Sequence, residues 1–301
     1  MDILEVTKIE EKKSDKINVV ISGDKKVYLA ICALINSIYY NTKNEEEIQI
    51  FLIVESLEIR KDLVNVCQIK TELNDMLDIE RDDGGIKIII PPKELINKLR
   101  ENVENYIFYS VKGQVDYGKN KPNNIFNIIR FYFPKLLPKM VDKIVYLDSD
   151  MIVQGDVAEL FNILPEKEII GAVYQKYPYE LLTRKWILSK KLRGGLGQIL
   201  FNGGMYVTYM KKWVENNYTE LCMKILMMNT KKTCFFLGQT QPVMNIVFKR
   251  VFRIGNNWNQ TGLGESGCFL NNYYNTREDV KSAIPESDIL HWTGHCKPWL
   301  Y

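Results

Sequence analysis

The chain has 301 residues, of which 46% are hydrophobic and 26% charged, a composition that excludes a disordered protein. A net charge of only +3 at pH 7 argues against a nucleic-acid partner, because phosphate contacts normally need a concentrated basic face. No apolar run reaches the roughly eighteen residues of a membrane span, although peripheral membrane association stays compatible with the sequence. Six scattered cysteines without a C-x-x-C pair indicate reduced thiols, which favours a cytoplasmic protein.

The first part of the chain alternates apolar strands with helices. Residues 17–22 and 48–54 are continuous apolar runs, as in strands that are buried on both faces, and a helix is expected over 27–40 between them. A polar helix over 56–77 and a strand over 86–90 follow. This alternation predicts an α/β fold in which helices flank a mainly parallel central sheet.

The rest of the chain continues the alternation and shows no repeat or linker. We expect a buried helix over 125–133, which carries Arg130, and a strand over 143–147. The remaining expected elements are helices over 93–112, 211–227 and 240–249 and strands over 169–173 and 204–208. One domain is therefore predicted.

Two carboxylates follow the strand over 143–147 directly, in the run Asp148-Ser149-Asp150. On an extended chain, residues two apart point to the same face, and ligands of parallel sheets bind at the carboxyl ends of strands. Hard carboxylate oxygens suit Mn²⁺ or Mg²⁺ better than Zn²⁺. A solvated turn is the alternative, since D-x-D alone is a common chance motif. The buried strand before it favours a bound cation, because unpaired carboxylates beside a core are costly.

The C-terminal segment offers partners for a metal-bound phosphate. An imidazole nitrogen of His291 can join a Mn²⁺ coordination sphere. Gly294 would let the backbone approach a phosphate closely, and Lys297 would meet it as a point charge. The alternative for His291 is a structural histidine in the core. We expect His295 to be structural or exposed.

Three blocks of sequence carry a resemblance to a known family. The run V-Y-L-D-S-D-M-I-V-Q-G-D over 145–156 resembles the metal-site signature of family 8 glycosyltransferases. Phe201-Asn202-Gly203-Gly204 resembles that family's F-N-[AS]-G motif at the sugar site. The C-terminal H-x-x-G-x-x-K-P-W, which begins at His291, is similar to its closing signature. The blocks fall in family order, and the resemblance covers about residue 17 to 301.

The resemblance implies a GT-A nucleotide-binding fold and a retaining transfer of a hexose, glucose or galactose, from a UDP-sugar. Mn²⁺ would be the metal, with Mg²⁺ as the alternative, and the acceptor would be a saccharide or glycoprotein. One GT-A domain over 1–301 would comprise a nucleotide- and metal-binding half, about 17–160, and a sugar- and acceptor-binding half, about 161–301.

The resemblance also assigns roles to individual residues. Asp148, Asp150 and His291 would be the metal ligands. The remaining positions would contact the donor: Ser22 and Asp24 at the base, Gly294 and Lys297 at the diphosphate, and Arg130, Asn202 and Gly203 around the sugar. The alternative for Arg130 is a buried ion pair with Asp148 or Asp150, and both roles can hold together.

Two departures from the family pattern bear on mechanism. Where the family often has D-D-N-Y, this chain has Asp24-Lys25-Lys26-Val27, and valine cannot stack on a base. Where the family has D-Q-D followed by L-N, this chain has T-Q-P-V-M-N over 240–245, so Gln241 matches and both acids are absent. A covalent intermediate needs a nucleophilic carboxylate. We therefore expect a front-face reaction in which Gln241 stabilises the anomeric carbon; the alternative is a simple hydrogen bond to the sugar.

Two rival functions share the predicted scaffold. A nucleotidyltransferase would need a glycine-rich triphosphate loop after the first strand, and Ser22-Gly23-Asp24-Lys25 is not one. A non-catalytic sugar-nucleotide-binding module is supported by the absent acids around Gln241. The complete set of candidate metal ligands favours the enzyme.

Overall fold

The structure is a computed structural model, and it describes residues 16–59, 85–104, 125–175, 200–228, 240–264, 281–293 and 296–300. Most of the expected helix over 56–77 and the second part of the expected helix over 93–112 lie outside these ranges.

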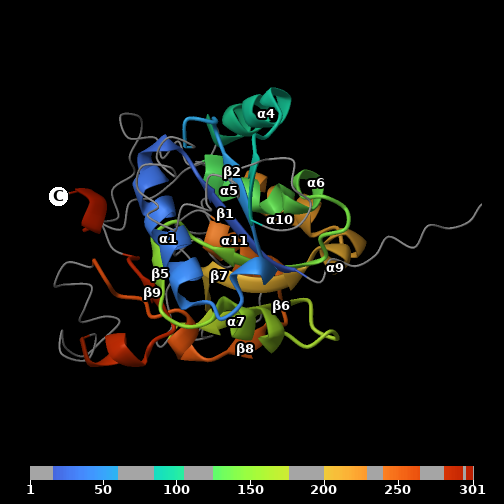
Figure 1. The fold of residues 1–301 in the computed structure, drawn as a ribbon. Helices are drawn as coiled ribbons and strands as arrows, with labels where there is room; N and C mark the ends of the chain where they lie inside the picture. The colour runs from blue at the N-terminus through green and yellow to red at the C-terminus, as the bar shows by residue number, and fades with distance from the viewer. Residues whose placement is uncertain are drawn as a thin grey trace, which may run out of the picture.

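The main feature of the fold is a seven-stranded sheet with helices on both faces (Figure 1). β7 runs antiparallel to both of its neighbours, β4 and β6, while the other neighbouring pairs are parallel. The prediction of an α/β fold with a mainly parallel sheet is therefore confirmed. In sheet order the strands are β3 (Gly85–Ile89), β2 (Ile48–Val54), β1 (Ile17–Gly23), β4 (Lys143–Leu147), β7 (Phe201–Tyr209), β6 (Ile170–Tyr174) and β8 (Phe252–Ile254).

The central strands are mostly apolar because helices cover both of their faces. Every residue of β1 and β2 is buried. Successive side chains point to opposite faces, so Val19 and Ile21 join one hydrophobic cluster and Val20 joins the other. The first cluster includes α1 (Tyr28–Asn41) and α7 (Val157–Ile163). The second includes α4 (Lys93–Glu104), α5 (Ile125–Ile128), α6 (Phe133–Leu136), α9 (Met210–Glu215), α10 (Tyr218–Met228) and α11 (Thr240–Val247).

Two expected helices are broken in the structure. The helix expected over 125–133 consists of α5, a 3₁₀ turn and α6, with Pro134 in the first turn of α6. The helix expected over 211–227 is divided into α9 and α10 by Asn217, whose φ of 53° is left-handed and ends α9. The 3₁₀ segments are η1 (Lys25–Val27), η2 (Glu45–Glu47), η3 (Ile129–Tyr132), η4 (Asn256–Trp258), η5 (Ile284–Glu286) and η6 (Pro298–Leu300).

A second, two-stranded sheet pairs β5 (Met151–Val153) with β9 (Ile289–His291) in antiparallel register. Helix α1 holds β5 through two side chains. The Oγ of Ser37 accepts a hydrogen bond from the Val153 N–H at 2.9 Å, and the Nδ2 of Asn41 donates to the Val153 carbonyl at 2.9 Å. Both backbone groups of Val153 are thereby satisfied by α1. This small sheet lies beside α1 (Figure 1).

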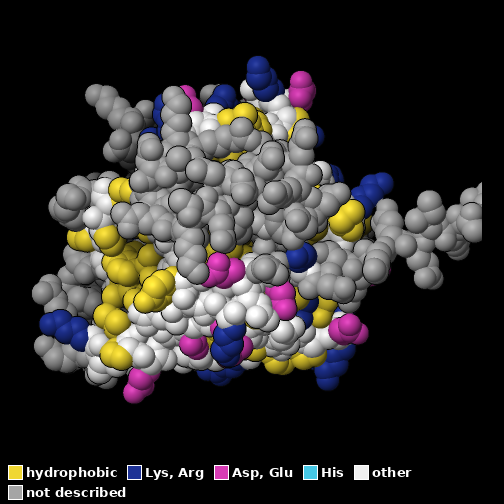
Figure 2. Space-filling model, viewed as in Figure 1, with side chains coloured by type: hydrophobic (Ala, Val, Ile, Leu, Met, Phe, Trp, Pro, Cys, Tyr) yellow, Lys and Arg dark blue, Asp and Glu magenta, His cyan; other side chains and the backbone are white. Residues whose placement is uncertain are grey.

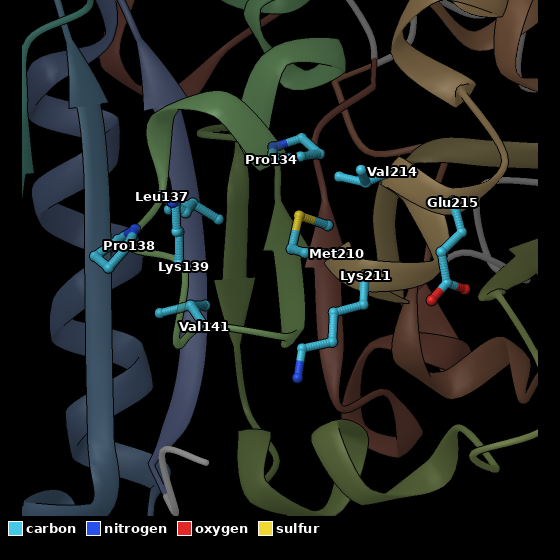
Figure 3. A pocket seen from close by; sticks show the side chains of 9 residues that line it. All are labelled: Pro134, Leu137, Pro138, Lys139, Val141, Met210, Lys211, Val214 and Glu215. Carbon is cyan, nitrogen blue, oxygen red and sulfur yellow. The ribbon is translucent and has the colours of Figure 1, made fainter. Parts of the chain in front are cut away.

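The surface of the described residues shows an apolar region, a region of mixed charge and a groove. Apolar side chains gather over α1 and β5, while basic and acidic side chains intermix along the lower part of the same view (Figure 2). A groove of about 280 Å³, lined in part by Pro134, Val141, Met210 and Val214, opens near the start of β4 and the end of β7 (Figure 3). It lies at the opposite end of β4 from Asp148. No helix among the described residues is long and apolar enough to cross a membrane.

The bonds from α1 to β5 predict an effect of Asn41 on stability. Asn41→Ala leaves the partly buried carbonyl of Val153 without its donor, so the free energy of unfolding should fall by about 1–2 kcal/mol. Urea unfolding measures this change. The control is Asn44→Ala, an exposed position, with an expected change below about 0.5 kcal/mol. Equal values for the two variants would contradict the role of Asn41.

Candidate metal and sugar-nucleotide site

The candidate site lies at the carboxyl ends of two neighbouring parallel strands. β1 and β4 pair with Ile21 opposite Leu147, so Ser22 and Asp24 are carried to the same edge as Asp148. β1 is buried throughout and β4 is buried from Ile144 onward, so the core holds both strands that lead to this edge. Such an edge is the usual ligand-binding position of an open α/β sheet.

Asp148 is held by two donors on one of its oxygens. Its Oδ1 accepts from Nη2 of Arg130 at 2.9 Å and from the hydroxyl of Tyr146 at 2.5 Å. The Arg130 guanidinium also donates to the carbonyl of Gly203 at 2.6 Å and lies 4.5 Å from the Tyr146 ring centroid. Burial alone would lower the pKa of Arg130, but its surroundings, Tyr146 and Asp148 foremost, outweigh burial and raise it. Arg130 therefore stays charged and leaves Oδ2 of Asp148 for another ligand.

Asp150 and His291 are neighbours because of the small sheet. Met151 pairs with His291 across β5 and β9, and the Trp292 N–H donates to the Asp150 carbonyl at 2.9 Å. The Nε2 of His291 lies 3.2 Å from Oδ1 of Asp150, and Nζ of Lys297 lies 2.7 Å from Oδ2. Burial opposes ionisation of Asp150, but His291 and Lys297 hold its pKa well below the usual range.

These side chains form a compact set of potential metal ligands. One ligand atom each from Asp148, Asp150 and His291 lies within 4.8 Å of the others. Gly204 forms a wall of this space: a Cβ there would lie 2.5 Å from Cε1 of His291 and 2.7 Å from Oδ2 of Asp148. Two carboxylate oxygens and an imidazole nitrogen around one small space fit a divalent cation such as Mn²⁺. The residues therefore fit the implied metal.

The candidate sugar side of the site is built from β7 and α11. The N–H of Gly203 donates to Oε1 of Gln241 at 3.1 Å. Asn245 fixes α11 to β7, because its side chain bonds both the N–H and the carbonyl of Phe201. Thr240, where the family pattern has an acid, donates its hydroxyl to Oδ1 of Asn127 at 2.7 Å. Gln241 is thus held against Gly203 by a direct hydrogen bond. The neighbouring position 240 offers a hydroxyl and no carboxylate.

The other predicted donor contacts are placed at or near this edge. The Oγ of Ser22 donates to the Phe126 carbonyl at 3.0 Å, and the carboxylate of Asp24 accepts from the Lys26 N–H at 3.0 Å. Lys297 is paired with Asp150 and also donates to the Trp292 carbonyl. Gly294 lies outside the described residues.

Several contributors were not assigned from the sequence. The Oδ1 of Asn259 lies 2.9 Å from Nδ1 of His291, and its Nδ2 donates to Oδ1 of Asn202 at 3.1 Å. Tyr146 supports Asp148, and Asn127 bonds both Arg130 and Thr240. The polar run N-N-W-N-Q over 256–260 is visible in the sequence, but nothing in it indicates a partner for His291.

Solved structures share this architecture. The galactosyltransferase LgtC, in complex with donor and acceptor sugar analogs, superimposes with a TM-score of 0.60 at 16% identity, covering 94% of this chain and 89% of that one. Mouse xyloside xylosyltransferase 1 gives a TM-score of 0.59 at 15% identity, covering 93% of this chain and 98% of that one. The fold is therefore of the GT-A glycosyltransferase class.

Sequence comparison narrows the class to one family. Residues 18–301 match the sequence model described as glycosyl transferase family 8. The chain belongs to glycosyltransferase family 8, as the three sequence blocks indicated.

Curated relatives of this chain carry names that describe different proteins of the family. Glycosyltransferase 8 domain-containing protein 1 of Danio rerio is 27% identical over 310 residues, which cover 96% of this chain and 75% of the relative. Probable galacturonosyltransferase-like 4 of Arabidopsis thaliana is 29% identical over 180 residues, or 58% of this chain and 49% of the relative. The matched part of this chain spans about half the length of that plant relative.

Adjacent glycines in β7 give a matched test of the ligand geometry. Gly204→Ala places a methyl group against His291 and Asp148, so these two ligands must shift. Mn²⁺ affinity should therefore fall at least tenfold, which is the typical loss when groups that orient metal ligands are changed. Gly203→Ala meets only ordinary contacts, the nearest being Cα of Gln241 at 3.4 Å, and should keep Mn²⁺ affinity within about threefold. Isothermal titration of both folded variants measures the difference. Unchanged affinity in Gly204→Ala would contradict this ligand arrangement.

Proposed function

We propose that the chain is a retaining glycosyltransferase that moves a hexose, glucose or galactose, from a UDP-sugar to a saccharide or glycoprotein acceptor. Mn²⁺ would be its metal, and Mg²⁺ is the alternative. The observation that carries this proposal is the meeting of Asp148, Asp150 and His291, from distant parts of the chain, at the carboxyl edge of a GT-A sheet.

The charges around this cluster suit a bound diphosphate. Asp148 is paired with Arg130 and Asp150 with Lys297, so each acid already has a cation beside it. A divalent cation held by Asp148, Asp150 and His291 would offset the negative charge that a departing nucleotide diphosphate gains. Lys297 lies beside Asp150 and could meet an anionic oxygen there as a point charge. Ser22 and Asp24, at the end of β1, are the candidate contacts to the base.

The residues on either side of Gln241 support a front-face transfer. At the family's acidic positions stand Thr240, bonded to Asn127, and Pro242, so the matching positions offer no nucleophilic carboxylate. In the proposed reaction the bond from C1 to the phosphate oxygen breaks while a bond from C1 to the acceptor oxygen forms on the same face. The acceptor's proton passes to the leaving phosphate. Gln241, held by Gly203, would stabilise the positive charge at C1, and Arg130 would hold Asp148 and Gly203 in place.

A second candidate function is a non-catalytic module that binds a sugar nucleotide. The hydrogen bond between Thr240 and Asn127 favours it, because a neutral pair occupies the position where the family pattern has an acid. The module and the enzyme would both bind UDP with Mn²⁺. Turnover of a donor distinguishes them.

The donor is tested with a panel of UDP-glucose, UDP-galactose, UDP-galacturonic acid and UDP-xylose. We expect UDP release from a UDP-hexose in the presence of Mn²⁺ and its loss after addition of EDTA. Asp150→Ala should reduce the rate at least a hundredfold, because the variant removes a proposed metal ligand. Binding of a donor without release of UDP or transfer would favour the module. Release at an undiminished rate in Asp150→Ala would contradict the proposed metal role.

The role of Gln241 is tested by the kinetics of Gln241→Ala. If Gln241 stabilises charge that develops in the transition state, kcat should fall about 10²-fold or more with little change in KM for the donor. A rise in KM with unchanged kcat would show instead that Gln241 only binds the sugar. Mass spectrometry of the wild-type protein after incubation with donor alone provides a second check. A glycosyl adduct on an Asp or Glu would contradict the front-face reaction.

A further inference from the structure

We infer that Asn259 is a positioning residue that fixes the proton of His291 on Nδ1 and so presents Nε2 as a free ligand to the metal. The inference rests on the proposed function in one respect only, the binding of a divalent cation by Asp148, Asp150 and His291. It assigns to Asn259 a role in metal affinity that does not require contact with the metal.

A backbone group of fixed polarity orients the side-chain amides of Asn202 and Asn259. The N–H of Gly204 can only donate, and it lies 2.8 Å from the side chain of Asn202. The facing atom of Asn202 must therefore be its oxygen. The same oxygen lies 3.1 Å from the amide of Asn259, whose facing atom must then be the nitrogen. Gly204 thus dictates the orientation of both amides.

The orientation of the Asn259 amide in turn decides which nitrogen of the His291 imidazole carries a proton. With its nitrogen turned to Asn202, Asn259 presents its oxygen to Nδ1 of His291 at 2.9 Å. An amide oxygen accepts only, so Nδ1 must carry a proton. In the neutral ring Nε2 then has a lone pair, and it lies 3.2 Å from the Asp150 carboxylate. Two lone pairs that face each other are stabilised by a cation between them, which is either a proton or a metal ion.

The surroundings of Asn259 make this arrangement rigid. Its side chain is buried, with 4% of the residue exposed, and its own N–H caps η4 by donating to the carbonyl of Asn256, the first residue of η4. The following residue, Gln260, pairs with β9: its N–H donates to the Ile289 carbonyl, and its carbonyl accepts from the His291 N–H. Asn259 is therefore held in register with the ligand that it orients.

The side-chain amides of Asn202 and Asn259 also connect the candidate sugar side of the site with the candidate metal ligands. Asn202 is a candidate contact to the donor sugar, and its oxygen is occupied by Gly204 and Asn259. Both hydrogen bonds that the Asn202 side chain makes with the described residues use this oxygen, and neither uses Nδ2. Gly204 and Asn259 therefore together hold the oxygen of the Asn202 amide and leave its Nδ2 end for a ligand.

Two substitutions at Asn259 separate its acceptor from its donor. Asn259→Ala removes both, and Mn²⁺ affinity should fall about 10–100-fold, as is typical for loss of a partner that orients a metal ligand. Asn259→Asp keeps an oxygen for Nδ1 of His291 but loses the donor to Asn202, so Mn²⁺ affinity should stay within about threefold of wild type. Asn256→Ala and Asn256→Asp, at an exposed position of the same segment, are the matched controls and should bind Mn²⁺ as wild type does.

Isothermal titration with Mn²⁺ alone, on variants whose thermal unfolding shows that they are folded, measures these affinities without turnover. Wild-type affinity in Asn259→Ala would overturn the inference. An equal loss in Asn259→Ala and Asn259→Asp would also overturn it, because the acceptor would then not be what matters. If the wild-type protein bound no Mn²⁺, the proposed metal site would fail and the inference with it.

Nuclear magnetic resonance of ¹⁵N-histidine-labelled, metal-free protein tests the tautomer directly. The chain has only two histidines, His291 and His295, so His295→Ala assigns the signals. At alkaline pH the neutral ring of His291 should carry its proton on Nδ1 in the wild type and in the Asn256 controls, and lose this preference in Asn259→Ala. A wild-type ring protonated on Nε2 would overturn the inference whatever the activity of the enzyme.

Discussion

The pairing of β5 with β9 is the contact that brings His291 beside the two acids, Asp148 and Asp150. β5 begins directly after Asp150, and β9 ends at His291, so the register of Met151 with His291 places the imidazole beside the carboxylate. A slip of one residue would turn His291 to the other face of the strand. Helix α1 holds β5 through Ser37 and Asn41, and Gln260 holds β9 from its other side. The geometry of the site therefore depends on backbone hydrogen bonds as much as on the ligands themselves.

The two acids are kept close together by cations on their outer sides. Arg130 is buried against Asp148, and Lys297 contacts Asp150, so the oxygens that remain are those turned toward His291 and Gly204. Breaking such a pair in a buried place leaves an uncompensated charge, which costs about 3–5 kcal/mol. The arrangement is thus both a support for the fold and a preorganised set of ligands. The ion pair that the sequence suggested as an alternative for Arg130 is present, and it is compatible with a role at the sugar.

Much of the fold could be predicted because its central strands are buried and mostly apolar. The runs over 17–22, 48–54 and 143–147 each became a strand of the main sheet. Strands of three residues, such as β5, β8 and β9, give no periodic signal and were missed.

At the site, Asp148 and Asp150 could be found from their place after a buried strand, whereas His291 was assigned by resemblance. Asn259 could not be assigned its role, since its contacts with Asn202 and His291 span 57 and 32 residues of sequence and arise only when η4 packs beside β9.

The most direct test of the account is the position of Mn²⁺ in crystals grown with Mn²⁺ and UDP, located by anomalous diffraction. The account predicts one Mn²⁺ about 2–2.5 Å from Asp148, Asp150 and Nε2 of His291, with the diphosphate on its open side. A Mn²⁺ bound elsewhere, or one that leaves His291 uncoordinated, would contradict it.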